Sequence, residues 1–124
     1  MRRPLLALAA VLALSAPAFA DELSDANAAI AAAKLSPESD IAMWCGAAYT
    51  IASAAASDDA AKKSADDLAN ALFGKAAALL TKDGVADADL GSFGTDYTVV
   101  VKAQLVDQTE APEHTQEECA AAAK

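Results

Sequence analysis

Alanine is the feature of this sequence that most restricts its fold. Of the 104 residues that follow position 20, 29 are alanine, and larger apolar side chains recur between them at three- and four-residue spacing. Alanine is the best helix former and is poor in strands, and this spacing places side chains on one face of a helix. The sequence therefore predicts an all-α fold, a small Ala-rich bundle of four to five helices.

The first twenty residues differ in pattern from the rest of the chain. Arg2 and Arg3 precede an apolar run at residues 5–14, and the small-residue pattern Ala18-Phe19-Ala20 follows. This order is typical of a cleaved secretory signal peptide. We therefore expect residues 1–20 to be a signal peptide and residues 21–124 to be a single helical domain. The expected location is the periplasm, with secretion into the medium as the alternative.

Residues 21–124 are strongly acidic. They contain 18 Asp and Glu residues against seven Lys and no Arg, which gives a net charge of −11. Nucleic-acid binding depends on Lys and Arg side chains that neutralise phosphates, so we exclude that function. No segment after position 20 approaches the roughly 20 continuous apolar residues of a membrane span, and we expect no membrane insertion after signal cleavage. The charge favours a basic protein as partner.

Helix start and stop signals divide this acidic part of the chain. Ser24 or Asp25 can cap a first helix that ends near Lys34, and Ser36 before Pro37 is typical of the start of a second helix over about 37–56. Ser57, followed by two acidic residues, is the expected N-cap of a third helix of about 24 residues, which ends before a C′ glycine at Gly84.

The predicted core consists of the apolar stripes of these helices. The second helix contributes Ile41, Trp44, Cys45, Ala48, Ile51, Ala52 and Ala55. The third contributes Ala61, Ala65, Leu68, Leu72, Ala76 and Leu79, flanked by Phe73 and Leu80.

The segment 85–106 admits two secondary structures. Leu90, Phe93, Tyr97, Val101 and Leu105 form a helical stripe, yet residues 97–101 are a β-branched run that would also suit a strand. We favour the helix, because a single strand would have no partner for its backbone hydrogen bonds. Further on, Thr115 and Glu118 form a capping box, which predicts a terminal helix from about residue 116 to the end.

The sequence has two cysteines, Cys45 and Cys119. In an oxidising compartment the simplest interpretation is one disulfide, which would connect the terminal helix to the second helix. The alternative is a redox-active pair. Against it, the sequence has no Cys-x-x-Cys motif, and Glu117 and Glu118 beside Cys119 disfavour a thiolate.

His114 is the one histidine and the obvious candidate for a site. With Glu113, Glu117 and Glu118 it could form a His/carboxylate metal site, but these ligands would lie on one exposed turn, whereas zinc ligands converge from several directions. A surface histidine before a capped helix is the simpler interpretation, and we expect no metal ligands. The acidic pairs Asp58/Asp59 and Asp66/Asp67 are expected on solvated helix faces, with the first pair at a helix start.

No motif indicates catalysis. The sequence lacks the Gly-x-Ser-x-Gly elbow of serine hydrolases and a glycine-rich phosphate loop, so we predict no catalytic residue, no cofactor and no enzymatic activity. Trp44, Tyr49, Phe93 and Tyr97 could line a ligand pocket, although aromatic residues on helical stripes are more often core residues.

The run Met43-Trp44-Cys45-Gly46-Ala47-Ala48-Tyr49, together with Glu117-Glu118-Cys119, resembles small two-cysteine secreted proteins of alphaproteobacterial type. In architecture the chain is also similar to the HdeA-type periplasmic acid-stress chaperones, which are helical, have one disulfide and carry a Trp near the first Cys. It departs from them in its higher Ala content and its longer loop between cysteines. The periplasmic immunity proteins of type VI secretion are likewise small, helical and disulfide-linked.

Three functional hypotheses follow. The first is a non-enzymatic periplasmic protein that binds a protein partner, as an inhibitor or immunity factor does, because the acidic surface could steer a basic partner. The second is an acid-stress chaperone, because protonation of 18 acidic side chains would reverse the net charge. The third, an enzyme, would need a pocket whose titratable residues no motif indicates.

Overall fold

The computed structural model describes residues 21–124, and the predicted signal peptide lies outside the described residues. These residues contain helices joined by turns and no strand, which confirms the all-α prediction. Residues 21–33 are helical. They are followed by α2 (Pro37–Ala55), α3 (Asp59–Lys82), a short 3-10 helix η1 (Asp87–Asp89), α4 (Leu90–Leu105) and α5 (Gln116–Ala122).

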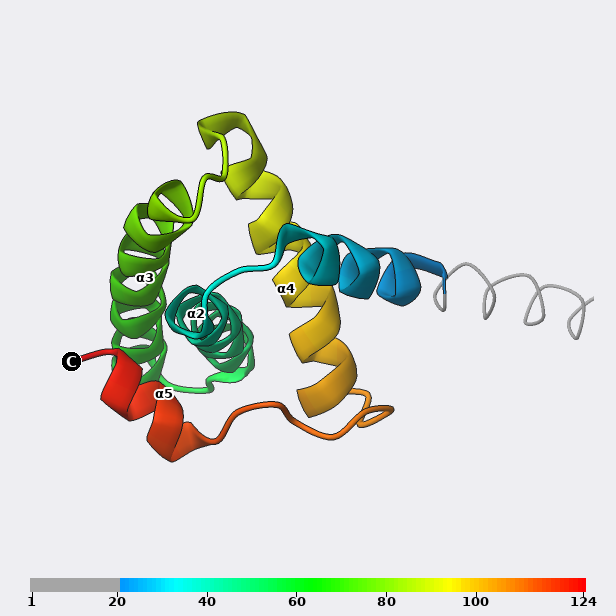
Figure 1. The fold of residues 1–124 in the computed structure, drawn as a ribbon. Helices are drawn as coiled ribbons and strands as arrows, with labels where there is room; N and C mark the ends of the chain where they lie inside the picture. The colour runs from blue at the N-terminus through cyan, green and yellow to red at the C-terminus, as the bar shows by residue number, and fades with distance from the viewer. Residues whose placement is uncertain (1–20) are drawn as a thin grey trace, which may run out of the picture.

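Helix α2 is the centre of the bundle. It packs against α3, α4 and α5, which surround it in Figure 1. Six consecutive α2 residues, 42–47, are buried, so the helix has no solvent face at this level. The predicted single apolar face was therefore incomplete. It omitted Ala42, Met43 and Ala47, which are almost fully buried, and it included Ala52 and Ala55, which are exposed.

The helix ends follow the local signals with two corrections. Residues 21–33 are all helical, so Ser24 and Asp25 lie inside the first helix and do not cap its start. The Ser36 hydroxyl accepts a hydrogen bond from the Ser39 amide at 3.3 Å, as expected of the α2 N-cap. At the start of α3 the cap is Asp58 and not Ser57, because the Asp58 carboxylate accepts from the Ala61 amide at 2.7 Å. Gly84 ends α3 with a φ of 94°, the left-handed conformation that glycine adopts without strain.

Helix α3 turns a slightly different face to α2 than its sequence predicted. Its buried line is Ala65, Ala69, Leu72, Ala76 and Leu80. Ala61 is exposed and Leu79 only half-buried, whereas Leu80 is fully buried. The contact is close because α2 offers a glycine there. A Cβ at Gly46 would lie 2.9 Å from the Phe73 ring, so the absence of a side chain at Gly46 makes room for α3.

Helix α4 settles the assignment of the β-branched run in favour of a helix. Val100 and Val101 are buried at 1% and 0% exposure, and Tyr97 is buried beside them. Leu105 at the end of the predicted stripe is 37% exposed, and Val106 beyond it is 54% exposed. The buried residues of the run, Tyr97, Val100 and Val101, are spaced at i, i+3 and i+4 and so share one face of the helix, whereas a strand would bury alternate residues. None of the helices within residues 21–124 has the length and hydropathy of a membrane span.

The terminal helix α5 has seven residues and is held by contacts to the centre of the bundle. The Thr115 hydroxyl accepts from the Glu118 amide at 3.1 Å, as the capping box predicts. In a capping box the Glu118 side chain would also accept from the Thr115 amide, but here the Glu118 carboxylate contacts the His114 ring instead. Lys75 of α3 donates to the Ala122 carbonyl at 3.0 Å. The predicted disulfide joins Cys119 to Cys45 with a Cα–Cα distance of 5.3 Å.

We expect loss of this bridge to destabilise α5 before the rest of the fold. A seven-residue helix is marginal without tertiary support, and the bridge closes a long loop, with a sequence separation of 74. Reduction or Cys119→Ser should lower the free energy of unfolding by about 2 to 5 kcal/mol. Hydrogen exchange should become faster in α5 than in α3. Thiol titration of the unreduced, denatured protein is the control, and two free thiols per chain would contradict the linkage.

Candidate functional site

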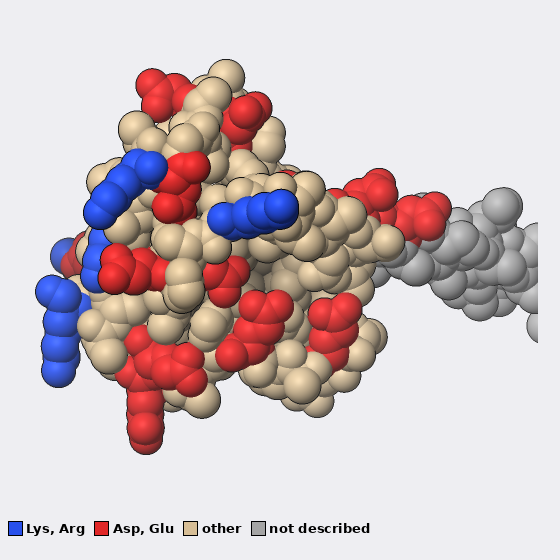
Figure 2. Space-filling model, in the orientation of Figure 1, with Lys and Arg blue, Asp and Glu red and all other residues tan. Residues whose placement is uncertain are grey.

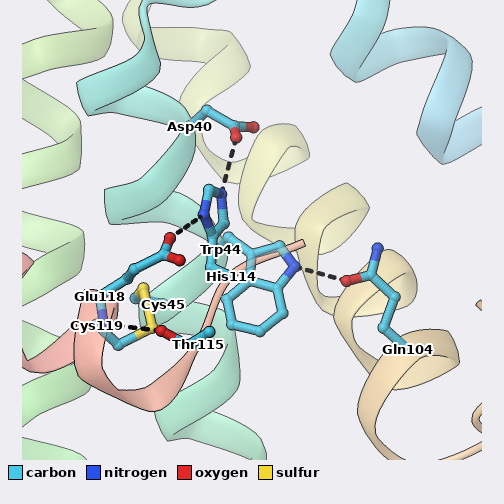
Figure 3. Close-up of a disulfide and its surroundings, with 8 residues drawn as sticks. All are labelled: Asp40, Trp44, Cys45, Gln104, His114, Thr115, Glu118 and Cys119. Atoms are coloured by element: carbon cyan, nitrogen blue, oxygen red, sulfur yellow. Dashed lines mark hydrogen bonds and ion pairs between the residues drawn. A yellow bond between two sulfur atoms is a disulfide. The ribbon is translucent and has the colours of Figure 1, made fainter. Parts of the chain in front are cut away.

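The residues with the most notable chemistry meet where α5 and the preceding loop cover α2. Figure 3 shows the disulfide with Trp44, His114, Glu118 and Gln104 around it. Cys45 is fully buried and Cys119 is 3% exposed. The disulfide therefore belongs to the core, and it carries the end of the chain onto the middle of α2.

A buried glutamine connects Trp44 to the loop before α5. Gln104 of α4 is 2% exposed, and its side-chain oxygen accepts a hydrogen bond from Trp44 Nε1 at 2.8 Å. The same oxygen accepts from the backbone amide of Glu113 at 3.1 Å. One side chain thus satisfies the indole N–H and fixes the path of the loop, and no pattern in the sequence indicated this role.

His114 lies between two carboxylates that come from different parts of the chain. Its Nε2 is 3.1 Å from Asp40 Oδ2 and its Nδ1 is 2.9 Å from Glu118 Oε2. The Trp44 ring meets it edge-on, with 5.4 Å between ring centroids. The interpretation of His114 as a plain surface histidine was wrong, because only 17% of its side chain is exposed. Figure 3 shows its ring pointing from the loop toward α2.

The two carboxylates shift the pKa of the groups they touch. Burial alone would lower the pKa of His114, but hydrogen bonds to Glu118 and Asp40, with their negative charge, outweigh burial and raise the pKa above its ordinary value of 6.5. Tyr97 donates to Asp40 at 2.5 Å. Burial, this hydrogen bond and the charges of Asp40 and Glu113 raise the pKa of Tyr97 well above 10.0. Tyr97 therefore remains a hydrogen-bond donor at any physiological pH.

Three side chains here could converge on a metal ion. Asp40, Glu113 and His114 each offer one ligand atom, and these atoms lie within 4.8 Å of one another. The sequence indicated His114 and Glu113 but gave no sign of Asp40, which is 74 positions from the histidine. Glu117, the other residue of the predicted alternative, is exposed on α5.

An apolar groove lies beside His114. It encloses about 360 Å³, which is at the small end of the range for ligand pockets. The end of α4 and the segment around α5 complete the walls opposite α2. The lining residues are Trp44, Ala48, Tyr49, Ala52, Leu105, His114, Gln116 and Cys119. This surface is called the α2/α5 groove below.

The remaining candidates from the sequence are distributed through the fold. Four aromatic residues were candidates for a ligand pocket. Trp44 and Tyr49 line the α2/α5 groove, whereas Tyr97 is a core residue and Phe93 packs against the core. The acidic pairs are exposed on α3 or at its start. Their members also have specific contacts, since Asp58 caps α3, Asp67 pairs with Lys63 at 2.7 Å and Asp66 accepts from Ser53.

We expect Gln104→Ala to destabilise the protein, because it removes three hydrogen bonds: the two that its side-chain oxygen accepts and the one that its Nε2 donates to the Glu113 carboxylate at 3.5 Å. The substitution leaves the indole N–H of a buried tryptophan without its acceptor and releases the Glu113 amide, a loss of about 1 to 3 kcal/mol. Chemical denaturation followed by the fluorescence of Trp44, the single tryptophan of the chain, measures it. Gln116→Ala on the exposed first turn of α5 is the matched control, with an expected change within about 0.5 kcal/mol. Equal effects of the two would contradict the role of Gln104.

The chain was compared with known proteins at the levels of family, sequence and structure. No protein-family model, no curated protein and no solved structure matches it. The resemblances noted from the sequence therefore stay predictions, and function is argued from the geometry of the described residues.

Proposed function

We propose that this protein acts in the periplasm as a non-enzymatic binding protein, and that the α2/α5 groove receives an apolar side chain of a basic protein partner. The observation that carries the proposal is the groove itself, because an apolar hollow with exposed apolar residues at its edge is typical of a binding surface. Leu105 lines the groove and is 37% exposed, and its neighbour Val106 is 54% exposed.

The charge around the groove supports a basic partner. Residues 105–119 border the groove opposite α2, and they contain five acidic residues and neither Lys nor Arg. Figure 2 shows acidic side chains spread over the face drawn, whereas lysines gather mainly along α3, which holds Lys62, Lys63, Lys75 and Lys82. A protein with basic residues around one apolar anchor would match this pattern, because charge complementarity steers association and fixes orientation.

Ala52 and Ala54 provide a matched pair of variants for this proposal. Both are exposed on α2, but only Ala52 lines the groove, so Ala52→Lys places a bulky cation in the groove while Ala54→Lys places it elsewhere. With the tagged full chain as bait in a periplasmic extract at low salt, we expect a basic protein to be retained by wild type and by Ala54→Lys. Ala52→Lys should lose it, and added salt should weaken retention.

Two results would contradict the proposal. One is that no protein is retained above background at low salt. The other is that Ala52→Lys and Ala54→Lys retain the same proteins equally, which would place binding outside the groove.

An acid-stress chaperone is the second candidate, favoured by the carboxylates that join α2 to α3. Asp83 accepts hydrogen bonds from the buried Ser39 hydroxyl at 2.6 Å and from the amide and hydroxyl of Ser36. The Ser39 contact and then the Ser36 amide hold the pKa of Asp83 below its ordinary value of 3.8. Asp66 accepts from the buried Ser53 hydroxyl in the same interface. Acid would therefore weaken α2–α3 packing.

Asp83→Asn tests this acid sensitivity. Because the folded pKa of Asp83 is depressed, its stabilisation is present above the unfolded pKa and is lost as pH falls through the folded one. Wild type should exceed Asp83→Asn in stability at neutral pH, and the difference should shrink between about pH 5 and pH 2. Asp87→Asn, at an exposed position of η1, should show no such trend. If aggregation of an acid-denatured client enzyme near pH 2 is unchanged by the purified protein, the chaperone candidate is eliminated.

A further inference from the structure

We propose that Asp40, Glu113 and His114 bind a divalent transition-metal ion, with zinc as the best match to their chemistry. The inference does not rest on the proposed function, because Asp40 and Glu113 do not line the α2/α5 groove and the site depends on ligand atoms, not on apolar area. Imidazole nitrogen and carboxylate oxygen are ordinary zinc ligands. The sequence argument against a metal was that its ligands would share one exposed turn, and the fold removes that objection.

The ligands come from two directions. Asp40 lies in the first turn of α2, whereas Glu113 and His114 lie in the loop before α5. The loop is fixed on both sides of these two residues, by the Glu113 amide bonded to Gln104 and by the disulfide at Cys119. The two sets of ligands are thus presented by parts of the chain whose relative position is set by the core.

The distances suit a small ion after limited adjustment. The 3.1 Å between His114 Nε2 and Asp40 Oδ2 is close to the edge of about 3.3 Å of a tetrahedron with zinc bonds near 2.0 Å. An ion would take the place of the proton that these two atoms share. The Glu113 carboxylate is exposed and is held by a long hydrogen bond of 3.5 Å from Gln104 Nε2, so a small rotation can close the remaining gap within the 4.8 Å cluster. A water molecule would complete four ligands, as in zinc sites that have three protein ligands.

The groups behind the ligands are of the kind that orient metal sites. Glu118 Oε2 is 2.9 Å from His114 Nδ1, the nitrogen that faces away from Asp40. Histidine ligands of metals almost always donate this second N–H to a carboxylate or carbonyl. On the other side, Tyr97 donates to Asp40 Oδ1 and leaves Oδ2 facing the histidine. Glu118 and Tyr97 are therefore positioning residues in this proposal.

The charges at the cluster also favour a cation. Asp40, Glu113 and Glu118 place three carboxylates around one half-buried imidazole. A divalent ion bound by the first two would offset their charge and release the proton of Nε2, so binding should weaken as pH falls.

Calorimetric titration of zinc into the chelator-treated full chain near neutral pH tests the site. We expect one saturable site per chain in wild type and a rise of the melting temperature with zinc. His114→Gln and Glu113→Gln should each bind at least about tenfold more weakly, and Glu118→Gln should weaken binding by about 10- to 100-fold. Glu117→Gln changes an exposed acid on the same turn and should bind zinc as wild type does.

Either of two results would overturn the proposal. The first is no saturable binding by wild type up to about 1 mM zinc, where the free energy of binding is only about −4 kcal/mol. The second is binding of zinc by Glu113→Gln and His114→Gln as tightly as by wild type, which would assign the ion to other acidic surface groups. Glu113 is exposed, and the amide oxygen of Gln can still accept the hydrogen bond from Gln104 Nε2, so Glu113→Gln should fold like wild type. Circular dichroism without zinc verifies this for each variant.

Discussion

The disulfide between Cys45 and Cys119 is the constraint on which the arrangement of the candidate site depends. It joins the middle of α2, the most buried helix, to a seven-residue helix that could not stay folded by itself. Because α5 is held there, the loop before it must cross the end of α4 and pass close to the first turn of α2. The groove and the His114 cluster both lie along that path.

The core around the bridge is made mostly of small side chains, and this explains how α2 can be enclosed on several sides. Alanines at 42, 47, 69 and 76 are buried, and Gly46 leaves room for the Phe73 ring. Small residues let helix backbones approach closely, but each contributes little apolar area. The covalent link and the hydrogen bonds of Gln104 and Asp83 therefore matter more here than in a bundle with a core of large aliphatic residues.

His114 connects the two proposed sites. His114 is one of the residues that line the α2/α5 groove, and its two ring nitrogens face Asp40 and Glu118. An ion at the cluster would hold this ring and the adjacent loop in one position, and would thereby fix one wall of the groove. The two proposals nevertheless depend on different groups of atoms. The groove depends on apolar area next to Leu105 and Trp44, and the metal site depends on the separation of nitrogen and carboxylate oxygen atoms.

The sequence by itself determined the helices and their link. The all-α class, the start of α2 at Ser36, the end of α3 at Gly84 and the Thr115 cap depend on residues within a few positions of each other, so local patterns were enough. The cysteine pairing followed because two cysteines allow one intramolecular bridge. The Ser57 cap was wrong by one residue, since two adjacent residues could both serve and backbone geometry selected Asp58.

Only the tertiary structure decided which faces are buried and which distant residues meet. The helical period identifies one apolar stripe on α2. It does not reveal that other helices surround α2, and this packing is what buries Met43 and Ala47. Likewise, the contacts of Asp40 with His114 and Tyr97, and of Gln104 with Trp44, span 57 to 74 positions. Such contacts depend on how whole helices pack, and a period of 3.6 residues carries no information about the partner across the core. Of the three side chains that could hold a metal ion, the sequence therefore indicated His114 and Glu113 but not Asp40, and the geometry of the cluster came from the fold.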